Sequence, residues 1–113
     1  LIRPEKLEDV KKILDDINCG GMTLSTVMGC GTQKGISSDT EETVNEIRGF
    51  KTTINLLPKV KVEVVIEDKD VETIVEKMRE TCATGHVGDG KIFIRDIEDV
   101  IRIRTGERGT KAL

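Results

Sequence analysis

The stretch between residues 84 and 91 is rich in glycine and reads Thr84-Gly85-His86-Val87-Gly88-Asp89-Gly90-Lys91. Glycines so close together pack poorly and lose much backbone entropy on folding, so we expect the bare backbone to have a use. One use is to end a helix, with Gly85 in the left-handed conformation that often follows one. The other is to hold phosphate groups with backbone N–H groups and Lys91. Because the spacing differs from the phosphate-binding loop G-x-x-x-x-G-K-[ST], the stretch by itself favours the helix end.

Two further groups of residues supply polar chemistry: the glycine-rich turn Gly29–Gly35 and the pair Arg102-x-Arg104. Each has a simple structural explanation, because Gly-x-Gly is common at bulges and charged residues are common on exposed strands. Taken with Gly88–Lys91, they bring bare amides, a lysine and two guanidinium groups to an otherwise acidic chain. These groups are suited to a polyphosphate, which is our functional hypothesis.

The composition predicts a single domain, residues 1–113, with an aliphatic core. Hydrophobic residues make up 36% and charged residues 35%, and there are two Phe and no Trp or Tyr. The net charge of −3 and the scarcity of aromatic residues argue against nucleic acid as a partner. No apolar run of membrane length and no signal peptide is visible, so we expect a cytoplasmic protein. The opening Leu1-Ile2-Arg3-Pro4 reads like the end of a strand, and we expect a few residues to precede it.

Catalytic and metal-binding patterns are scarce in the sequence. The three cysteines show no C-x-x-C spacing and His86 is the only histidine, so a zinc site, a disulfide framework and a Cys–His pair are all disfavoured. A Ser-His-Asp set is not apparent either. We therefore expect a binding module and not an enzyme. The alternative is a small phosphotransferase or ATP hydrolase that uses the same basic cluster.

Hydrophobic periodicity predicts how the elements follow one another. One helix covers Pro4–Asn18, and a second runs from a cap at Asp68 or Asp70 to Cys82. One strand is expected to end at Leu1–Arg3. Further strands are expected at Met22–Met28, Lys59–Ile66, Ile92–Ile94 and Val100–Arg104. Gly35 to about Thr53 shows no clear apolar period, which predicts a long functional loop. The order β-α-β-β-α-β is that of the ferredoxin-like α+β fold, with two helices on one face of an antiparallel sheet.

Six segments carry a resemblance to a known family: Ile2-Arg3-Pro4 with Lys6-Leu7, Gly21-Met22-Thr23, Gly29-x-Gly31-x-Gln33-Lys34-Gly35, Leu57-Pro58-Lys59-Val60-Lys61, Thr84-Gly85-x-x-Gly88-Asp89-Gly90-Lys91-Ile92-Phe93, and Arg102-Ile103-Arg104-Thr105-Gly106-Glu107. In this order they resemble the PII family of nitrogen signal-transduction proteins along nearly the whole chain. The resemblance implies a homotrimer of ferredoxin-like subunits with ATP or ADP in each cleft between subunits. It also implies a regulatory loop at about 35–53, a nucleotide-binding turn at 83–91 and a C-terminal segment at 102–113.

The resemblance further implies which residues bind which ligand. The phosphates would be held by Gly88, Asp89, Gly90 and Lys91 of one subunit and by Arg102 and Arg104 of its neighbour. The rest of the nucleotide site would be lined by Thr23, Gly29, Gly31 and Val64. With ATP bound, the family takes up Mg²⁺ and 2-oxoglutarate. Gln33 would be the metal ligand, Lys59 would pair with a ligand carboxylate, and backbone amides near Lys34 and Gly35 would bind the same ligand.

The long loop departs from the family pattern. Many relatives carry a modified tyrosine there, whereas Arg48-Gly49-Phe50-Lys51 is followed by Thr52 and the chain has no tyrosine. The loop is also longer than usual, with an acidic stretch at Ser37–Glu46. We expect it to regulate a protein partner through Arg48 and Phe50 without covalent modification. An ammonium transporter, a nitrogenase or a metabolic enzyme is the expected target, so a membrane would be reached only through a transporter. A paralogue that senses another small molecule is the remaining alternative.

Overall fold

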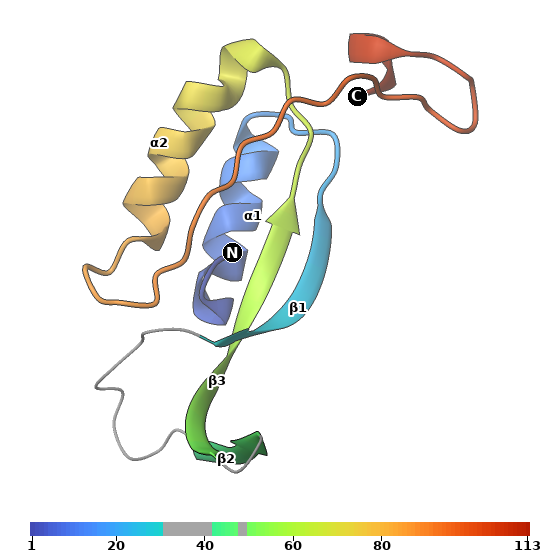
Figure 1. The fold of residues 1–113 in the computed structure, drawn as a ribbon. Coiled ribbons are helices and arrows are strands. Elements are labelled where there is room, and N and C mark those ends of the chain that lie inside the picture. The colour runs from blue at the N-terminus through green and yellow to red at the C-terminus, as the bar shows by residue number, and fades with distance from the viewer. Residues whose placement is uncertain (31–41, 48–49) are drawn as a thin grey trace.

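The computed structural model describes residues 1–30, 42–47 and 50–113, with side chains described for residues 1–30 and 56–113. Figure 1 shows two helices on one side of a layer of strands. In chain order the elements are η1 (Pro4–Lys6), α1 (Leu7–Asp16), β1 (Thr23–Cys30), β2 (Glu42–Ile47), β3 (Phe50–Glu63), η2 (Asp68–Asp70), α2 (Val71–Cys82) and η3 (Gly109–Ala112). The two predicted helices and the strand after the first helix are confirmed to within a few residues.

The long strand β3 lies between β1 and β2 and is antiparallel to both. Its ladder with β1 runs from Thr23 opposite Glu63 to Cys30 opposite Leu56. Residues opposite each other share a face of the sheet, so the buried Val60 faces the same way as its partner Thr26. The other face carries polar side chains, as the sequence predicted, and Lys61 and Glu63 form an ion pair 3.2 Å long.

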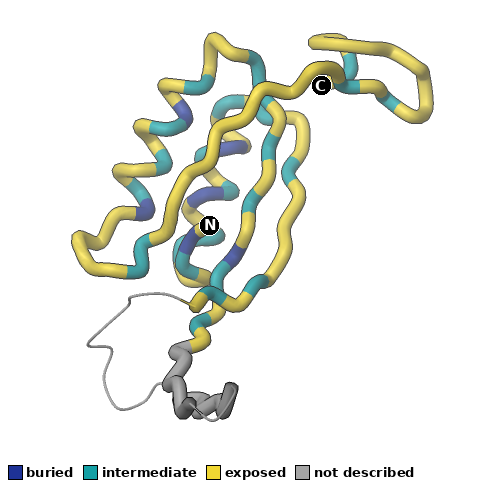
Figure 2. The backbone as a smooth tube through the Cα atoms, in the orientation of Figure 1, coloured by how far each residue is buried: buried dark blue, intermediate teal, exposed yellow. Residues whose placement is uncertain are grey.

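The helices cover the apolar face of the sheet because their hydrophobic residues recur once per turn. Val10 and Leu14 of α1 are the most completely buried side chains of the core, which also contains Ile2, Val60 and Cys82. In Figure 2 the buried segments lie on the two helices and on β3. Pro4 stands at the first position of η1, where its missing N–H costs no hydrogen bond. In the described residues no helix has the length and hydropathy needed to cross a bilayer.

The first two residues complete the sheet on the side of β3 away from β1. Ile2 exchanges two backbone hydrogen bonds with Val60, of 2.9 and 3.0 Å. On its other side Leu1 exchanges two with Lys91, of 3.0 and 3.2 Å. Both pairings are antiparallel, so the spatial order is Gly90–Lys91, Leu1–Ile2, β3, β1. An antiparallel layer in this order, with both helices on one face, is the ferredoxin-like α+β fold. The predicted fold class is therefore confirmed.

Two of the predicted strands are wrong. Ile92–Ile94 lies outside any strand, and Val100–Arg104 forms only an isolated bridge between Ile101 and Arg108. A strand needs neighbours for its backbone groups, and within the described residues the pairing of this segment ends where Lys91 meets Leu1. The residues around 101 instead fold back locally, with the Arg102 amide 2.9 Å from the Glu107 carbonyl.

The predicted long loop contains a hairpin in its described part. β2 pairs with the first half of β3, from Glu42 opposite Asn55 to Ile47 opposite Phe50. The described part of the predicted loop is therefore a strand hairpin, and β3 begins nine residues before Lys59, the predicted start of the strand. The missed signal was β-branched content, because Thr, Val and Ile are frequent in 43–54 and favour strands. The predicted acidic stretch Ser37–Glu46 lies mostly outside the described residues.

Candidate nucleotide-binding site

The turn from residue 83 to 91 connects α2 to the edge of the sheet. Helix α2 ends at Cys82 because Ala83 is already extended, with φ −71° and ψ 126°. Gly85, Gly88 and Gly90 then have φ of 82°, 103° and 109°. Residues other than glycine rarely adopt these angles. Gly85 therefore has the predicted left-handed conformation, but it lies two residues after the cap Ala83, so its predicted position directly after the helix is wrong.

The side chain of Asp89 organises the turn from the inside. Its Oδ2 accepts the backbone amides of Thr84 at 2.7 Å and Gly85 at 3.1 Å. Its Oδ1 accepts the Thr84 hydroxyl and the Nε–H of Arg3, the latter at 3.1 Å. Four donors thus converge on one carboxylate that is 24% exposed. The hydroxyl and amide of Thr84, followed by Arg3 and the Gly85 amide, hold the pKa of the Asp89 carboxyl well below its usual range.

This lowered pKa predicts a pH dependence of stability. An aspartate with a depressed pKa in the folded state stabilises fully above its unfolded pKa of about 4, and the contribution is lost as the pH falls below that value. We expect the difference in Tm between the wild-type chain and Asp89→Asn to be constant above about pH 5 and to shrink below about pH 4. Thermal unfolding between pH 3 and pH 7 measures this difference. A difference that stays the same down to pH 3 would contradict the ionised role of Asp89.

Two cations fix the carbonyl groups of the same turn. The Arg3 guanidinium donates to the Val87 carbonyl at 3.0 Å, and the Lys59 ammonium donates to the Gly88 carbonyl. Burial and the nearby Arg3 charge lower the pKa of Lys59. In the described part of the chain, the amides of Gly88, Asp89 and Gly90 donate to no protein acceptor. The turn therefore offers consecutive N–H groups to an external anion, while its carbonyls are held by Arg3 and Lys59.

Close packing excludes a side chain at one of the predicted glycines and crowds it at another. A Cβ on Gly90 would lie 1.9 Å from the carbonyl oxygen of Leu1, so the neighbouring strand itself excludes a side chain. A Cβ on Gly29 would lie 3.2 Å from Cγ of Lys59. Gly29 therefore leaves room for the Lys59 side chain on its way to the turn. This gives both glycines a structural role beside the predicted ligand role.

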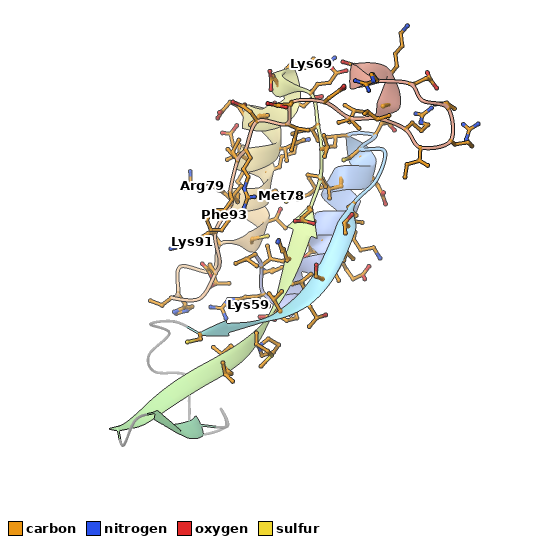
Figure 3. The ribbon with its side chains drawn as sticks, turned by 45° about the vertical axis from the view of Figure 1, so that its right-hand side comes forward. Lys59, Lys69, Met78, Arg79, Lys91 and Phe93 are labelled. Atoms are coloured by element: carbon orange, nitrogen blue, oxygen red, sulfur yellow. The ribbon has the colours of Figure 1, made fainter. Side chains whose placement is uncertain are left out.

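The two lysines of the site lie near the middle of the molecule. Figure 3 shows Lys59 beside β3 and Lys91 near Phe93 and Arg79, whereas Lys69 is at the top of the view, away from both. Lys91 is exposed, and its backbone is fixed by the pairing with Leu1. Around the turn, the three positive charges of Arg3, Lys59 and Lys91 face the two negative charges of Asp89 and Glu5. The local charge therefore favours an anion, although the whole chain is acidic.

The single chain places the predicted nucleotide residues at two ends of the sheet. Gly29 and the residues Gly88–Lys91 are at the end near Lys59. Thr23 lies at the other end of the β1–β3 ladder, and Val64 follows the last residue of β3 there. Figure 1 places the segment with the predicted arginines, 102–113, far from the turn at 83–91. One chain alone therefore does not bring the arginines to the turn.

The two predicted arginines differ in their surroundings. Arg102 forms an ion pair with Glu107 at 3.1 Å and donates to the carbonyls of Lys111 and Leu113. Arg104 is exposed, and within the described residues no ion pair is recorded for it. The remaining predicted residues, Gly31, Gln33, Lys34, Gly35 and Arg48, lie outside the described residues. Phe50 begins β3, with its side chain outside the described part.

The sequence analysis missed the roles of Arg3 and Thr84. Both occur in segments that carry the family resemblance, but no function was assigned to them. The role of Arg3 could have been inferred from the predicted order of strands. In the ferredoxin-like order the first strand lies beside the last, which brings residue 3 next to residues 87–91.

The comparisons with known proteins are extensive. The family model described as "Nitrogen regulatory protein P-II" matches residues 1–107. The chain belongs to the P-II family. "Nitrogen regulatory protein P-II 2" of Methanothermobacter thermautotrophicus is 49% identical over 113 residues, covering 100% of this chain and 92% of the relative. The "Nitrogen regulatory protein P-II" of Pasteurella multocida is 46% identical, covering 100% and 95%. The solved structure of Bacillus subtilis GlnK has a TM-score of 0.75 and 33% identity, covering 99% of this chain and 92% of the other.

Membership of the P-II family places the chain among nitrogen signalling proteins. Its relatives are named as regulatory proteins and not as catalysts. Among the residues whose side chains the structure describes, 1–30 and 56–113, no group of three or more His, Cys, Asp or Glu could hold a metal ion. The names of its relatives therefore support a role in nitrogen regulation.

Proposed function

We propose that this P-II chain is a homotrimeric sensor that binds ATP or ADP and, with Mg-ATP, 2-oxoglutarate. The long loop at about 35–53 then regulates a target protein according to the ligands bound. The observation that carries the proposal is the turn at 83–91, whose amides at Gly88, Asp89 and Gly90 have no protein acceptor among the described residues. Phosphate oxygens satisfy such amides, and the exposed Lys91 adds a charge-assisted contact.

A neighbouring subunit supplies the second wall of the nucleotide cleft. The turn and the segment with Arg102 and Arg104 lie far apart in the folded subunit. This separation is expected when each cleft is formed by the turn of one subunit and the arginines of the next. The polar sheet face with Lys61 and Glu63 supports a contact between copies. To reach the phosphates, Arg102 exchanges its ion pair with Glu107 for a more highly charged partner.

The site for 2-oxoglutarate lies where β1 and β3 meet the long loop. The Lys59 ammonium pairs with a carboxylate of the ligand in place of the Gly88 carbonyl that it contacts in the free chain. Gln33 supplies an amide oxygen to Mg²⁺, and amides near Lys34 and Gly35 bind the ligand. Magnesium in proteins commonly takes most of its ligands from phosphate and water, so a single protein ligand is compatible with its chemistry.

The regulated partner is a protein that contacts the loop through Arg48 and Phe50. An ammonium transporter, a nitrogenase and a metabolic enzyme are the candidate targets. Since the chain has no tyrosine, regulation does not use tyrosine modification. Ligand binding selects among loop conformations, and the target distinguishes them by affinity.

Replacing Lys91 with alanine tests the phosphate part of the proposal. We expect Lys91→Ala to weaken ATP binding by about 1.5–3 kcal/mol, or roughly ten- to hundredfold, because it removes a charge-assisted contact. Isothermal titration of ATP measures the change. Lys77→Ala is the matched control, since Lys77 is an exposed lysine on helix α2, outside both the turn and the segment with the arginines. Equal ATP affinity in the Lys91 and Lys77 variants would contradict the assignment of Lys91.

A further inference from the structure

A carboxylate lies in the middle of a turn that is proposed to bind polyphosphate. Asp89 separates Gly88 and Gly90, whose amides are the proposed phosphate donors. A negative charge there repels an anionic ligand, so its presence needs another explanation. Both carboxylate oxygens of Asp89 are already occupied by four donors from Thr84, Gly85 and Arg3.

We infer that Asp89 and Thr84 are positioning residues that shape the phosphate-binding turn, and that the Asp89 side chain does not itself bind the nucleotide. This inference rests on the proposed function and refines it. Asp89 draws the start of the turn, at Thr84 and Gly85, against its end. Thr84 reinforces this closure, since its hydroxyl donates to Asp89 and accepts the His86 amide at 3.3 Å. The closure fixes the peptide planes on either side of Asp89, and hence the direction of the neighbouring N–H groups.

Arg3 connects this closure to the sheet. Its Nε donates to Asp89 while its terminal nitrogen donates to the Val87 carbonyl. The residue before it, Ile2, is buried and hydrogen-bonded to Val60 of β3. The turn is therefore held in place by a rigid element, which is what a preformed anion site requires.

The substitution Asp89→Asn distinguishes a role in positioning the turn from a purely electrostatic role, because the two roles predict opposite changes in ATP affinity. Asparagine has nearly the same shape, but one carboxylate oxygen becomes an NH₂ donor that faces N–H or O–H donors from Thr84, Gly85 or Arg3. The closure is then broken. If Asp89 acted only as a negative charge near the phosphates, its neutralisation would strengthen ATP binding. If it positions the turn, ATP binding weakens.

The experiment measures adenosine, ADP and ATP affinities by titration for the wild-type chain, Asp89→Asn, Thr84→Val and Thr84→Ser. We expect Asp89→Asn and Thr84→Val to weaken ADP and ATP about tenfold or more, with adenosine unchanged, and Thr84→Ser to bind like the wild type because it keeps the hydroxyl. Thr84→Val keeps every charge, so it tests the closure even where Asp89→Asn folds poorly.

The opposite results are distinguishable. Unchanged or tighter ATP binding by Asp89→Asn, or equal ATP affinity in Thr84→Val and Thr84→Ser, would overturn the positioning role while leaving nucleotide binding intact. An equal loss for adenosine and ATP would also overturn it, since the damage would then not be specific to phosphate. A wild-type chain that binds no ATP would instead remove the proposed function, and the inference with it.

Discussion

Gly90→Ala is expected to lower the free energy of unfolding by about 3 kcal/mol or more. Two causes add at this position. The backbone has a φ of 109°, which alanine adopts only with strain. In addition, the new Cβ would lie 1.9 Å from the Leu1 carbonyl oxygen and 2.9 Å from its carbon, and both belong to the backbone of the neighbouring strand. The pairing of Leu1 with Lys91 must therefore open, which also displaces the turn at 83–91.

Chemical denaturation of the Gly90→Ala variant measures this loss. Gly21→Ala is the matched control, because the Gly21 backbone lies outside the positive-φ region and an added Cβ would have no neighbour within 4 Å. We expect that variant to stay within about 0.5 kcal/mol of the wild type. A Gly90 variant as stable as the Gly21 variant would show that Leu1 and Gly90 are not held together as described.

Lys59→Met is expected to abolish measurable 2-oxoglutarate binding, with a loss of about a hundredfold or more. Methionine keeps much of the apolar side chain that passes Gly29 but removes the ammonium group. The ligand carboxylate would then be desolvated beside the loop without its ionic partner, which is costly. The Gly88 carbonyl also loses its donor, so we expect a smaller loss in ATP affinity in the same variant.

Titration of 2-oxoglutarate in the presence of Mg-ATP measures the effect of Lys59→Met. Lys77→Met on the exposed side of α2 serves as the control and should bind like the wild type. Binding of 2-oxoglutarate by the Lys59 variant with wild-type affinity would show that another residue holds the carboxylate. A loss of equal size in both variants would point to a general effect of removing positive charge.

Much of the fold could be predicted from the sequence because its hydrophobic patterns are local. Helix α1 follows from the spacing of Val10 and Leu14, and the second half of β3 follows from the alternation around Val60. The hairpin of β2 and β3 was missed because its signal is β-branched content without an apolar period. Ile92–Ile94 was predicted as a strand from its composition, but strand formation also depends on a neighbour, which a local pattern does not contain.

The candidate site could be predicted only in part for a similar reason. The glycines and Lys91 stand out in the sequence because of their types and their spacing. The contacts of Asp89 with Arg3 join residues 86 positions apart, and those of Lys59 with Gly88 join residues 29 apart. Such contacts follow from the order of strands in space. In the proposed trimer, the positions of Arg102 and Arg104 relative to the turn depend on a second subunit.

The most direct test of the account is a titration of 2-oxoglutarate into the wild-type chain under two conditions, with saturating Mg-ATP and with saturating Mg-ADP. The account predicts binding with Mg-ATP and much weaker or undetectable binding with Mg-ADP, because the metal and the ATP phosphates complete the effector site at Gln33 and Lys59. Equal binding under both conditions would contradict the proposed dependence on ATP. No binding under either condition would contradict the assignment of 2-oxoglutarate as the effector.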